Sequence, residues 1–511
     1  MATSRSERPA RPLFRRVLIA NRGEIAVRVI RACRELGIES VAVFSEPDRT
    51  ALHVRQADHA YPIGPAAPTE SYLSIDKLLG VAKAAGAEAV HPGYGFLAER
   101  TAFAEACRSA GLVLIGPTPE AMAAMGDKLE ARRIMSRAGV PVVPGTEEPV
   151  SSESEVTRLA GEIGFPVLLK AAGGGGGKGM RLVERPGDLA GALRSARSEA
   201  KSSFGDDRVY IERAILQPRH VEVQVLGDSQ GHIIHLYERE CSIQRRHQKV
   251  IEESPSLAID QTTREAMGEV AVKAARTVNY TGAGTIEFLV DPARKFYFLE
   301  MNTRIQVEHP ITEAVTGVDL VKAQIEVAAG LPLGYRQEDI VQRGWAIECR
   351  VYAEDPENHF LPAPGKIEVL RVPSGIGIRD DSGVYEGFEV STNYDPLLSK
   401  LVAWGSNRNE AIERMLRALR EYTVVGPTTN LAFHRWALEH PAFRAGEIDT
   451  GFIARHFRPG APPDGLAADL PLIGAALAAV SRTRQAPNGA GVAAAPGSRW
   501  RELARREALR E

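Results

Sequence analysis

The sequence predicts an α/β protein, α+β in part, that is built from several domains. From Arg16 the chain reads strand, loop, helix and strand, which is the periodicity of a parallel βαβ unit. A second α/β pattern runs from about residue 127 to 330, and a third, strand-rich region from about residue 345 to 457 ends in a helix near residues 409–422. The length of 511 residues exceeds one hydrophobic core and fits about three domains.

The first βαβ unit can be assigned element by element. Residues 17–20 (VLIA) form a strand, residues 25–37 form a helix that Gly37 ends, and residues 40–44 (SVAVF) form the next strand. The loop between strand and helix has one glycine, Gly23, where a dinucleotide-binding fingerprint needs three. The scaffold therefore resembles a Rossmann domain, but a Rossmann-type NAD site is disfavoured.

Composition and charge exclude several classes of protein. Lys plus Arg (63) nearly balances Asp plus Glu (65), so no global basic field exists to attract nucleic acid. No apolar run approaches the roughly 20 residues that span a bilayer. The four cysteines are far apart, which excludes a CxxC site and indicates reduced thiols. We therefore expect a cytoplasmic protein that binds neither nucleic acid nor membrane.

The two ends of the chain differ in composition from its body. The first 16 residues are Arg-rich but lack the apolar core of a secretory signal, so we expect a disordered tail, with a transit peptide as the alternative. After Phe457 the composition shifts to Pro, Gly and Ala, with a charged, helix-prone end. We interpret this last stretch as a flexible or docking appendage.

The strongest local signal is a glycine-rich loop between two strands, PVLLKAAGGGGGKGMRLV, with Lys170 in the first strand. Glycines let backbone N–H groups close onto phosphate oxygens and let a loop move as a lid. A flexible linker is the alternative, but the flanking strands favour phosphate binding. A Walker loop fails at Ala172 and Gly179, a dinucleotide fingerprint fails because a strand follows, and a kinase loop fails because neither HRD nor DFG occurs.

Two neighbouring strands, GTIEFLV and KFYFLEMN, each carry one carboxylate, Glu287 and Glu300. They are joined by a turn around Asp291, so pairing them can bring both carboxylates together. Strand alternation puts Asn302 on the same face as Glu300. Such oxygen ligands suit Mg²⁺ bound to the phosphates of ATP. A solvated strand glutamate is the alternative, but the apolar neighbours of Glu300 disfavour it.

A basic run follows the glycine loop along the chain, in ERECSIQRRHQKVIEE. Its cations are Arg245, Arg246, His247 and Lys249. A solvated face or a nucleic-acid patch is the common meaning of such a run. Flanking glutamates weaken that interpretation and favour a compact site for a small anion.

Taken together, these residues closely resemble biotin carboxylases, the ATP-grasp subunits or domains of acetyl-, propionyl- and methylcrotonyl-CoA carboxylases and of pyruvate carboxylase. The resemblance covers residues 14–457 and includes IANRGEIAVRVIRA, HPGYGFLAE, MGDK, KAAGGGGGKGM, FLEMNTRIQVEHPITE and ECRVYAEDP. It implies a Rossmann-like pre-ATP-grasp domain (14–126), an ATP-grasp domain (127–335) with a mobile glycine-rich lid (about 142–214), and a C-terminal mixed α/β biotin carboxylase domain (340–457). Residues 458–511 would be an extra tail.

The resemblance also implies roles for individual residues. The nucleotide would be bound by Lys128, Lys170, Gly176, Gly177, Glu212, Arg213, Ile215, His220, His247, Glu287 and Glu300. The metal would be held by Glu287, Glu300 and Asn302. Bicarbonate and biotin would be bound by Lys249, Arg304, Gln306, Val307 and Arg350. Lys249, Arg304, Glu308 and Arg350 would be catalytic, with Glu308 as the general base.

The implied reaction is the ATP-dependent carboxylation of biotin by bicarbonate through carboxyphosphate, with Mg²⁺ or Mn²⁺. This is the first half-reaction of an acetyl-CoA or acyl-CoA carboxylase, as in fatty acid biosynthesis, and the biotin carboxylase subunit of pyruvate carboxylase is the alternative. None of the eight methionines adjoins a lysine, so we expect biotin on a separate biotin carboxyl carrier protein. Carboxyltransferase subunits and a homodimer are also expected.

Two rival functions fit the sequence less well. A ligase like carbamoyl-phosphate synthetase also activates bicarbonate, but it is built from two tandem copies and this chain shows one. A non-catalytic homologue would lack a metal carboxylate, the base or a phosphate lysine, and all of these are present.

Overall fold

The structure of the protein is a computed structural model, and it describes residues 13–173 and 179–460. Most of the expected terminal segments, and the lid glycines Gly176 and Gly177, lie outside the described residues. No helix within the described ranges combines the length and the apolar character needed to cross a membrane.

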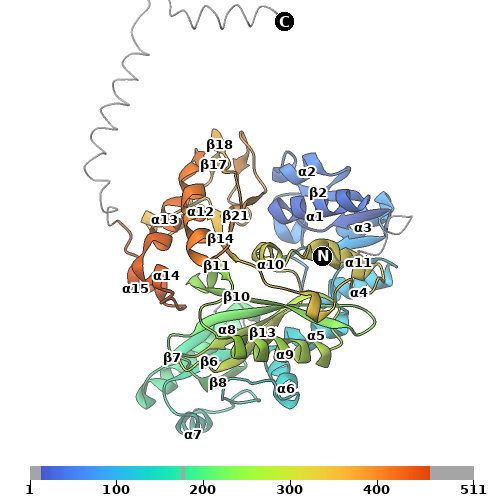
Figure 1. Ribbon diagram of the computed structural model, residues 1–511. Helices are drawn as coiled ribbons and strands as arrows, with labels where there is room; N and C mark the ends of the chain where they lie inside the picture. Colours follow the sequence, from blue (N-terminus) through green and yellow to red (C-terminus); the bar gives the residue numbers. More distant parts are fainter. Residues whose placement is uncertain (1–12, 174–178, 461–511) are drawn as a thin grey trace, which may run out of the picture. The chain divides into compact units, whose positions relative to one another are not determined.

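The N-terminal part contains a five-stranded parallel sheet in the order β3-β2-β1-β4-β5 (Figure 1). Its strands are β1 (Arg16–Ile19), β2 (Glu39–Ser45), β3 (His59–Gly64), β4 (Ala89–His91) and β5 (Val113–Leu114). Its helices are α1 (Gly23–Leu36), α2 (Leu52–Gln56), α3 (Ile75–Ala85) and α4 (Thr101–Ser109). Gly37 ends α1 with a left-handed φ of 74°, which glycine adopts without strain. The predicted βαβ unit is therefore confirmed.

The glycine-rich loop joins two strands, as predicted, and the structure shows that these strands belong to a three-stranded antiparallel sheet. Its strands are β6 (Val167–Ala171), β7 (Met180–Val183) and β8 (Val209–Arg213), in the order β7-β6-β8. The helices α7 (Glu153–Ile163) and α8 (Leu189–Phe204) accompany this sheet. Val156, Leu169, Leu193 and Ile211 form its core. Lys170 pairs with Met180 across the hairpin, so the loop starts beside this lysine.

The largest sheet has eight antiparallel strands in the order β13-β12-β9-β10-β11-β14-β21-β19. The strands are β9 (Arg219–Gly227), β10 (Ile233–Arg245), β11 (Gln248–Ser254), β12 (Gly282–Val290), β13 (Phe296–Asn302), β14 (Trp345–Tyr352), β19 (Ile378–Ser382) and β21 (Leu397–Gly405). Because β11 pairs with β14, the sheet continues across residues 335–340. Contacts within residues 1–459 form one compact unit and mark no division at this point, so the domain boundary expected there stays a prediction.

The described chain also contains further helices and pairs of short strands. The helices are α5 (Pro119–Gly126), α6 (Lys128–Arg137), α9 (Gln261–Thr277), α10 (His309–Thr316) and α11 (Leu320–Ala328). The paired short strands are β15 (Glu354–Asp355) with β16 (Leu361–Pro362), β17 (Gly365–Lys366) with β20 (Glu389–Val390), and β18 (Val369–Arg371) with β22 (Thr423–Val425). Two of these helices start at the site, α6 with Lys128 as its first residue and α10 directly after Glu308.

The prediction that one helix ends the C-terminal region was incomplete. The expected helix is α12 (Arg408–Glu421), which packs on β21 and β14 (Figure 1). Within the described residues three more helices follow it: α13 (Leu431–Glu439), α14 (Pro441–Ala445) and α15 (Phe452–His456). These helices are too short to show the helical spacing of apolar residues in the sequence. They are packed through contacts between aromatic rings, such as those of Phe433, Trp436 and Phe457.

Candidate active site

A cavity of about 330 Å³ brings together predicted residues from seven separate segments of the chain. Its lining includes Lys128, Lys170, His220, His247, Lys249, Glu287, Glu300, Asn302, Arg304, Gln306, Val307, Glu308 and Arg350. Of the described predicted residues, Glu212, Arg213 and Ile215 do not line it. Glu212 is adjacent, because it is buried beside Lys170, and its Oε1 accepts from Lys170 Nζ at 2.7 Å.

Lys249 on β11 is the cation at the centre of this cavity. Its Nζ donates to Glu287 Oε1 at 2.9 Å, to Glu308 Oε1 at 2.6 Å, and to Glu222. Burial alone would lower the pKa of this ammonium, but the three carboxylates outweigh burial and raise the pKa well above its ordinary value. Lys249 is therefore charged at neutral pH.

Glu308 lies between two cations at the start of α10. Its second oxygen accepts from Arg350 Nη2 at 2.8 Å, and its side chain is buried. Burial would raise the pKa of this carboxyl, but Lys249, Arg350 and Arg239 lower it well below its ordinary value. Glu308 is thus ionised, as a proton acceptor must be.

Arg350 on β14 is held from both ends. Its Nε donates to Glu252 Oε1 at 2.6 Å on β11. Its backbone carbonyl accepts from Asn430 Nδ2 at 2.9 Å and from the His434 ring at 2.8 Å. These contacts fix the guanidinium between Glu252 and Glu308.

The two predicted metal carboxylates are direct cross-strand partners, Glu287 on β12 and Glu300 on β13. Asn302 donates from Nδ2 to Glu287 Oε1 at 2.8 Å, while its oxygen accepts from Arg304 Nη2 at 2.9 Å. Glu300 lies 3.1 Å from Lys128 Nζ. The structure thus brings two carboxylates and an amide into one cavity, and these are the oxygen ligands that a hard divalent cation prefers. Their role as metal ligands stays a prediction.

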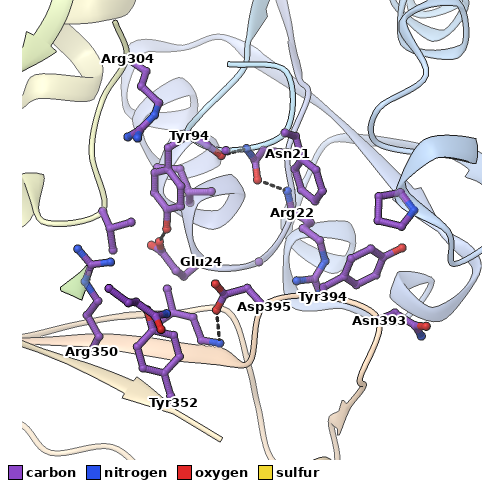
Figure 2. Close-up of a pocket in the computed structure, with 18 residues that line it drawn as sticks. Asn21, Arg22, Glu24, Tyr94, Arg304, Arg350, Tyr352, Asn393, Tyr394 and Asp395 are labelled. Carbon is purple, nitrogen blue, oxygen red and sulfur yellow. Dashed lines mark hydrogen bonds between the residues drawn. The ribbon is translucent and has the colours of Figure 1, made fainter. Parts of the chain in front are cut away.

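A second cavity of about 500 Å³ shares Gln248, Arg304, Val307 and Arg350 with the first (Figure 2). Its other walls come from the loop after β1 and the start of α1, from the loop after β4, from the end of β14, and from the segment before β21. The labelled side chains from these walls are Asn21, Arg22, Glu24, Tyr94, Tyr352, Asn393, Tyr394 and Asp395 (Figure 2).

Three residues of this region were missed in the sequence. Lys400 on β21 is completely buried, and its Nζ donates to the Val307 carbonyl at 2.9 Å and lies 3.1 Å from Glu24 Oε2. Tyr94 donates its hydroxyl to Glu24. Burial raises the pKa of Glu24 to about 7, although Lys400 partly offsets this. Glu24 and Tyr94 lie within motifs of the resemblance, which was their only signal.

The glycine-rich hairpin on a three-stranded sheet, next to a large antiparallel sheet that carries paired carboxylates, defines an ATP-grasp ligase. Three family models match the chain: "Biotin carboxylase, N-terminal domain" at residues 13–122, "Carbamoyl-phosphate synthase L chain, ATP binding domain" at 127–336, and "Biotin carboxylase C-terminal domain" at 348–455. The second of these matches once, and biotin carboxylase domains flank it.

Similar proteins carry related names. "Biotin carboxylase 1" of Bacillus subtilis is 52% identical over 86% of this chain and 98% of its own length. A pyruvate carboxylase subunit of Methanothermobacter thermautotrophicus is 55% identical over 87% of this chain and 91% of its own. A biotin carboxylase complex from Campylobacter jejuni superposes with a TM-score of 0.85 at 48% identity, covering 87% of this chain and 99% of that one. The chain therefore belongs to the biotin carboxylase family, whose members are ATP-dependent ligases.

Proposed function

We propose that this protein carboxylates biotin on a separate carrier protein, with ATP and bicarbonate as the other substrates. The observation that carries the proposal is the position of Glu308. It is an ionised carboxylate between Lys249 and Arg350. It lines the cavity that contains Lys128 and Lys170, and its partner Arg350 also lines the second cavity, which can hold an organic substrate. The biotin carboxylase domain of 2-oxoglutarate carboxylase from Hydrogenobacter thermophilus, with a TM-score of 0.84, was solved with MgADP, ADP and bicarbonate.

Bicarbonate would bind among Lys249, Arg304, Gln306 and Val307, with Glu308 as its base. Bicarbonate is a poor nucleophile until it loses its proton, and nearby cations stabilise the dianion. An anion bound here would share the cations that now pair with Glu308. Sharing them raises the pKa of Glu308 toward its ordinary value, so the carboxylate becomes a better base when its substrate is bound.

The nucleotide would occupy the first cavity. Lys128 and Lys170 would contact its phosphates, together with Gly176 and Gly177, while His220 and His247 lie near it. Glu212, Arg213 and Ile215 would lie beside the adenine. Glu287, Glu300 and Asn302 would hold Mg²⁺ or Mn²⁺, which would neutralise phosphate charge. Attack by the bicarbonate dianion on the γ-phosphoryl group would give carboxyphosphate, a step that depends on alignment and charge neutralisation.

Biotin would enter the second cavity, whose volume of about 500 Å³ suits a small organic molecule. Carboxyphosphate yields CO₂ and phosphate, and the phosphate can take the proton from N1′ of biotin. Arg350 lines both cavities, so its guanidinium can stabilise the negative ureido oxygen that results.

The proposed partners are a biotin carboxyl carrier protein, carboxyltransferase subunits and a second copy of this chain, in the cytoplasm. An acetyl-CoA or acyl-CoA carboxylase in fatty acid biosynthesis is the proposed assembly, with pyruvate carboxylase as the alternative. Proteins that co-purify with the chain would decide between these acceptors.

The direct test is ATP hydrolysis by the purified chain in the presence of Mg²⁺ and bicarbonate. We expect free biotin to accelerate it, and omission of bicarbonate to abolish the acceleration. A streptavidin blot should be negative, because no methionine here adjoins a lysine. Hydrolysis that is indifferent to biotin would refute the proposed function, and a positive blot would refute the separate carrier.

A further inference from the structure

Two buried carboxyl groups lie side by side behind Arg350. Glu252 on β11 and Glu348 on β14 are direct partners in the antiparallel register, and side chains so opposed have Cβ atoms about 4.5–5.5 Å apart. Glu252 is 1% exposed and Glu348 is 0% exposed. Neither residue belongs to the proposed substrate or metal contacts.

The hydrogen bonds of this pair are incomplete. Glu252 Oε1 accepts from Arg350 Nε at 2.6 Å. Glu252 Oε2 and both oxygens of Glu348 have no hydrogen-bond partner among residues 13–173 and 179–460. An ionised carboxylate without a donor is strongly unfavourable in a dry interior, and two opposed negative charges add repulsion. One proton between the two groups removes both problems.

The surrounding cations of the described chain are already engaged by groups other than Glu348. Arg350, two residues along β14, is engaged by Glu252 and Glu308. Lys400 of β21 is engaged by the Val307 carbonyl and by Glu24. The residue opposite Glu348 on β21 is Val402, and the residue opposite Val402 on β19 is Arg379, which donates to Glu313 and Asp381. His309 on α10 is a further titratable group of the packed elements.

Apolar side chains also cover this face of the sheet. Ala346 and Val402 pack with Ile311 and Val315 of α10, which cover the sheet at this point. Burial, followed by the charge of Glu252, raises the pKa of Glu348 well above its ordinary value. Burial also raises the pKa of Glu252, to about 7. Both directions agree with a shared proton.

We infer that Glu348 is a neutral acid whose O–H donates a hydrogen bond to Glu252, and that it thereby acts as a positioning residue for Arg350. Glu252 then presents a single negative charge to the guanidinium, which reaches forward to Glu308. Loss of the proton would place a second negative charge behind Arg350 and draw it away from Glu308. The inference rests on the proposed role of Arg350 in biotin binding, and it predicts that activity declines when Glu348 ionises.

Two variants test whether the side chain at position 348 acts as a hydrogen-bond donor or only fills space in the core. Glu348→Gln is neutral and keeps a donor for Glu252, so we expect its KM for biotin at pH 8 to stay within about twofold of the wild-type value. Glu348→Leu keeps the volume but has no donor, so we expect that KM to rise about tenfold, as for one lost buried hydrogen bond to a charged group. At higher pH, Glu348→Gln should retain activity where the wild type declines.

Infrared difference spectroscopy reports the proton directly. The wild-type spectrum minus that of Glu348→Gln at pH 8 should contain the carbonyl band of a protonated carboxylic acid. Asp380→Asn is the matched control, because Asp380 is another carboxyl with a raised pKa on the same sheet, and it faces Ser399 and Tyr422 instead of Arg350. This control should leave the KM for biotin and its pH dependence unchanged.

Three results would overturn the inference: absence of the carbonyl band, a Glu348→Gln enzyme as impaired as Glu348→Leu, or a Glu348→Gln chain that does not fold. The last is decisive because an amide is the nearest neutral mimic of the acid. The carbonyl band of the protonated acid can be measured whether or not the enzyme is active. Its presence in a chain without biotin-stimulated hydrolysis would refute the proposed function and leave the protonated pair intact.

Discussion

Substitution of Glu308 by Gln tests the assignment of the base most directly. Gln keeps the size of the side chain and one hydrogen-bond acceptor, but it cannot take a proton near neutral pH. General-base catalysis is worth roughly 10²–10⁴-fold, so bicarbonate-dependent ATP cleavage should fall by that factor. ADP affinity should barely change, because Glu308 contacts Lys249 and Arg350 and neither Lys128 nor Lys170, the lysines proposed to bind phosphate.

The same substitution has a limited effect on stability. Lys249 keeps Glu222 and Glu287, and Arg350 keeps Glu252, so neither cation loses all of its partners. We therefore expect a loss of about 1–3 kcal/mol, below the roughly 3–5 kcal/mol of a buried charge left unpaired. The pKa of Glu308 is lowered by folding, so this stabilisation is present above the ordinary pKa of 4.5 and disappears as the pH falls below it.

Glu313→Gln is the matched control for this experiment. Glu313 is also buried on α10, and its carboxylate accepts from Arg28 at 2.9 Å and from Arg379 at 2.7 Å. It should lose comparable stability and keep its turnover. Melting temperature, ADP affinity and bicarbonate-dependent hydrolysis are measured on one preparation of each protein. Near-normal turnover with a lowered melting temperature in Glu308→Gln would show that Glu308 is only an ion-pair partner.

Three further predictions concern the metal, a buried lysine and assembly. Glu300→Gln removes one anionic oxygen ligand, so the Mg²⁺ concentration for half-maximal activity should rise about tenfold, and an unchanged magnesium titration would remove Glu300 from the site. Lys400→Met releases the Val307 carbonyl, so KM for bicarbonate should rise about tenfold, whereas the exposed Lys366→Met should not alter it. Light scattering at micromolar concentration should give the mass of a homodimer, and a monomer alone would contradict it.

The predictable part of the fold was the part that local spacing determines. Apolar periodicity assigned the first βαβ unit, and Gly37 marked the end of its helix. Strand alternation and a short turn placed Glu287 opposite Glu300, and the register confirms this pairing. Each of these inferences uses residues that lie within about 30 positions of one another, where chain geometry leaves few alternatives.

The unpredicted part depends on contacts between distant segments. Lys400 reaches Val307 across 93 positions, and Glu252 meets Glu348 only because β11 pairs with β14 in one register. A shift of one residue would turn Glu348 to the opposite face of the sheet, and no local pattern in the sequence specifies that register. The helices α13 to α15 were missed for a related reason, since their stability comes from tertiary aromatic packing.

The cations of the cavity are already paired with carboxylates, and this pairing would couple the binding of bicarbonate to the basicity of Glu308. Lys249, Arg304 and Arg350 already contact carboxylates in this structure. A bound bicarbonate must therefore compete with internal anions, and its net electrostatic gain is small. The same competition weakens the hold of Lys249 and Arg350 on Glu308, and the basicity of Glu308 rises as a consequence. Because deprotonation turns bicarbonate into a dianion, these cations would interact more strongly with the product of that step than with bicarbonate itself, so loss of one of them should lower kcat as well as raise KM.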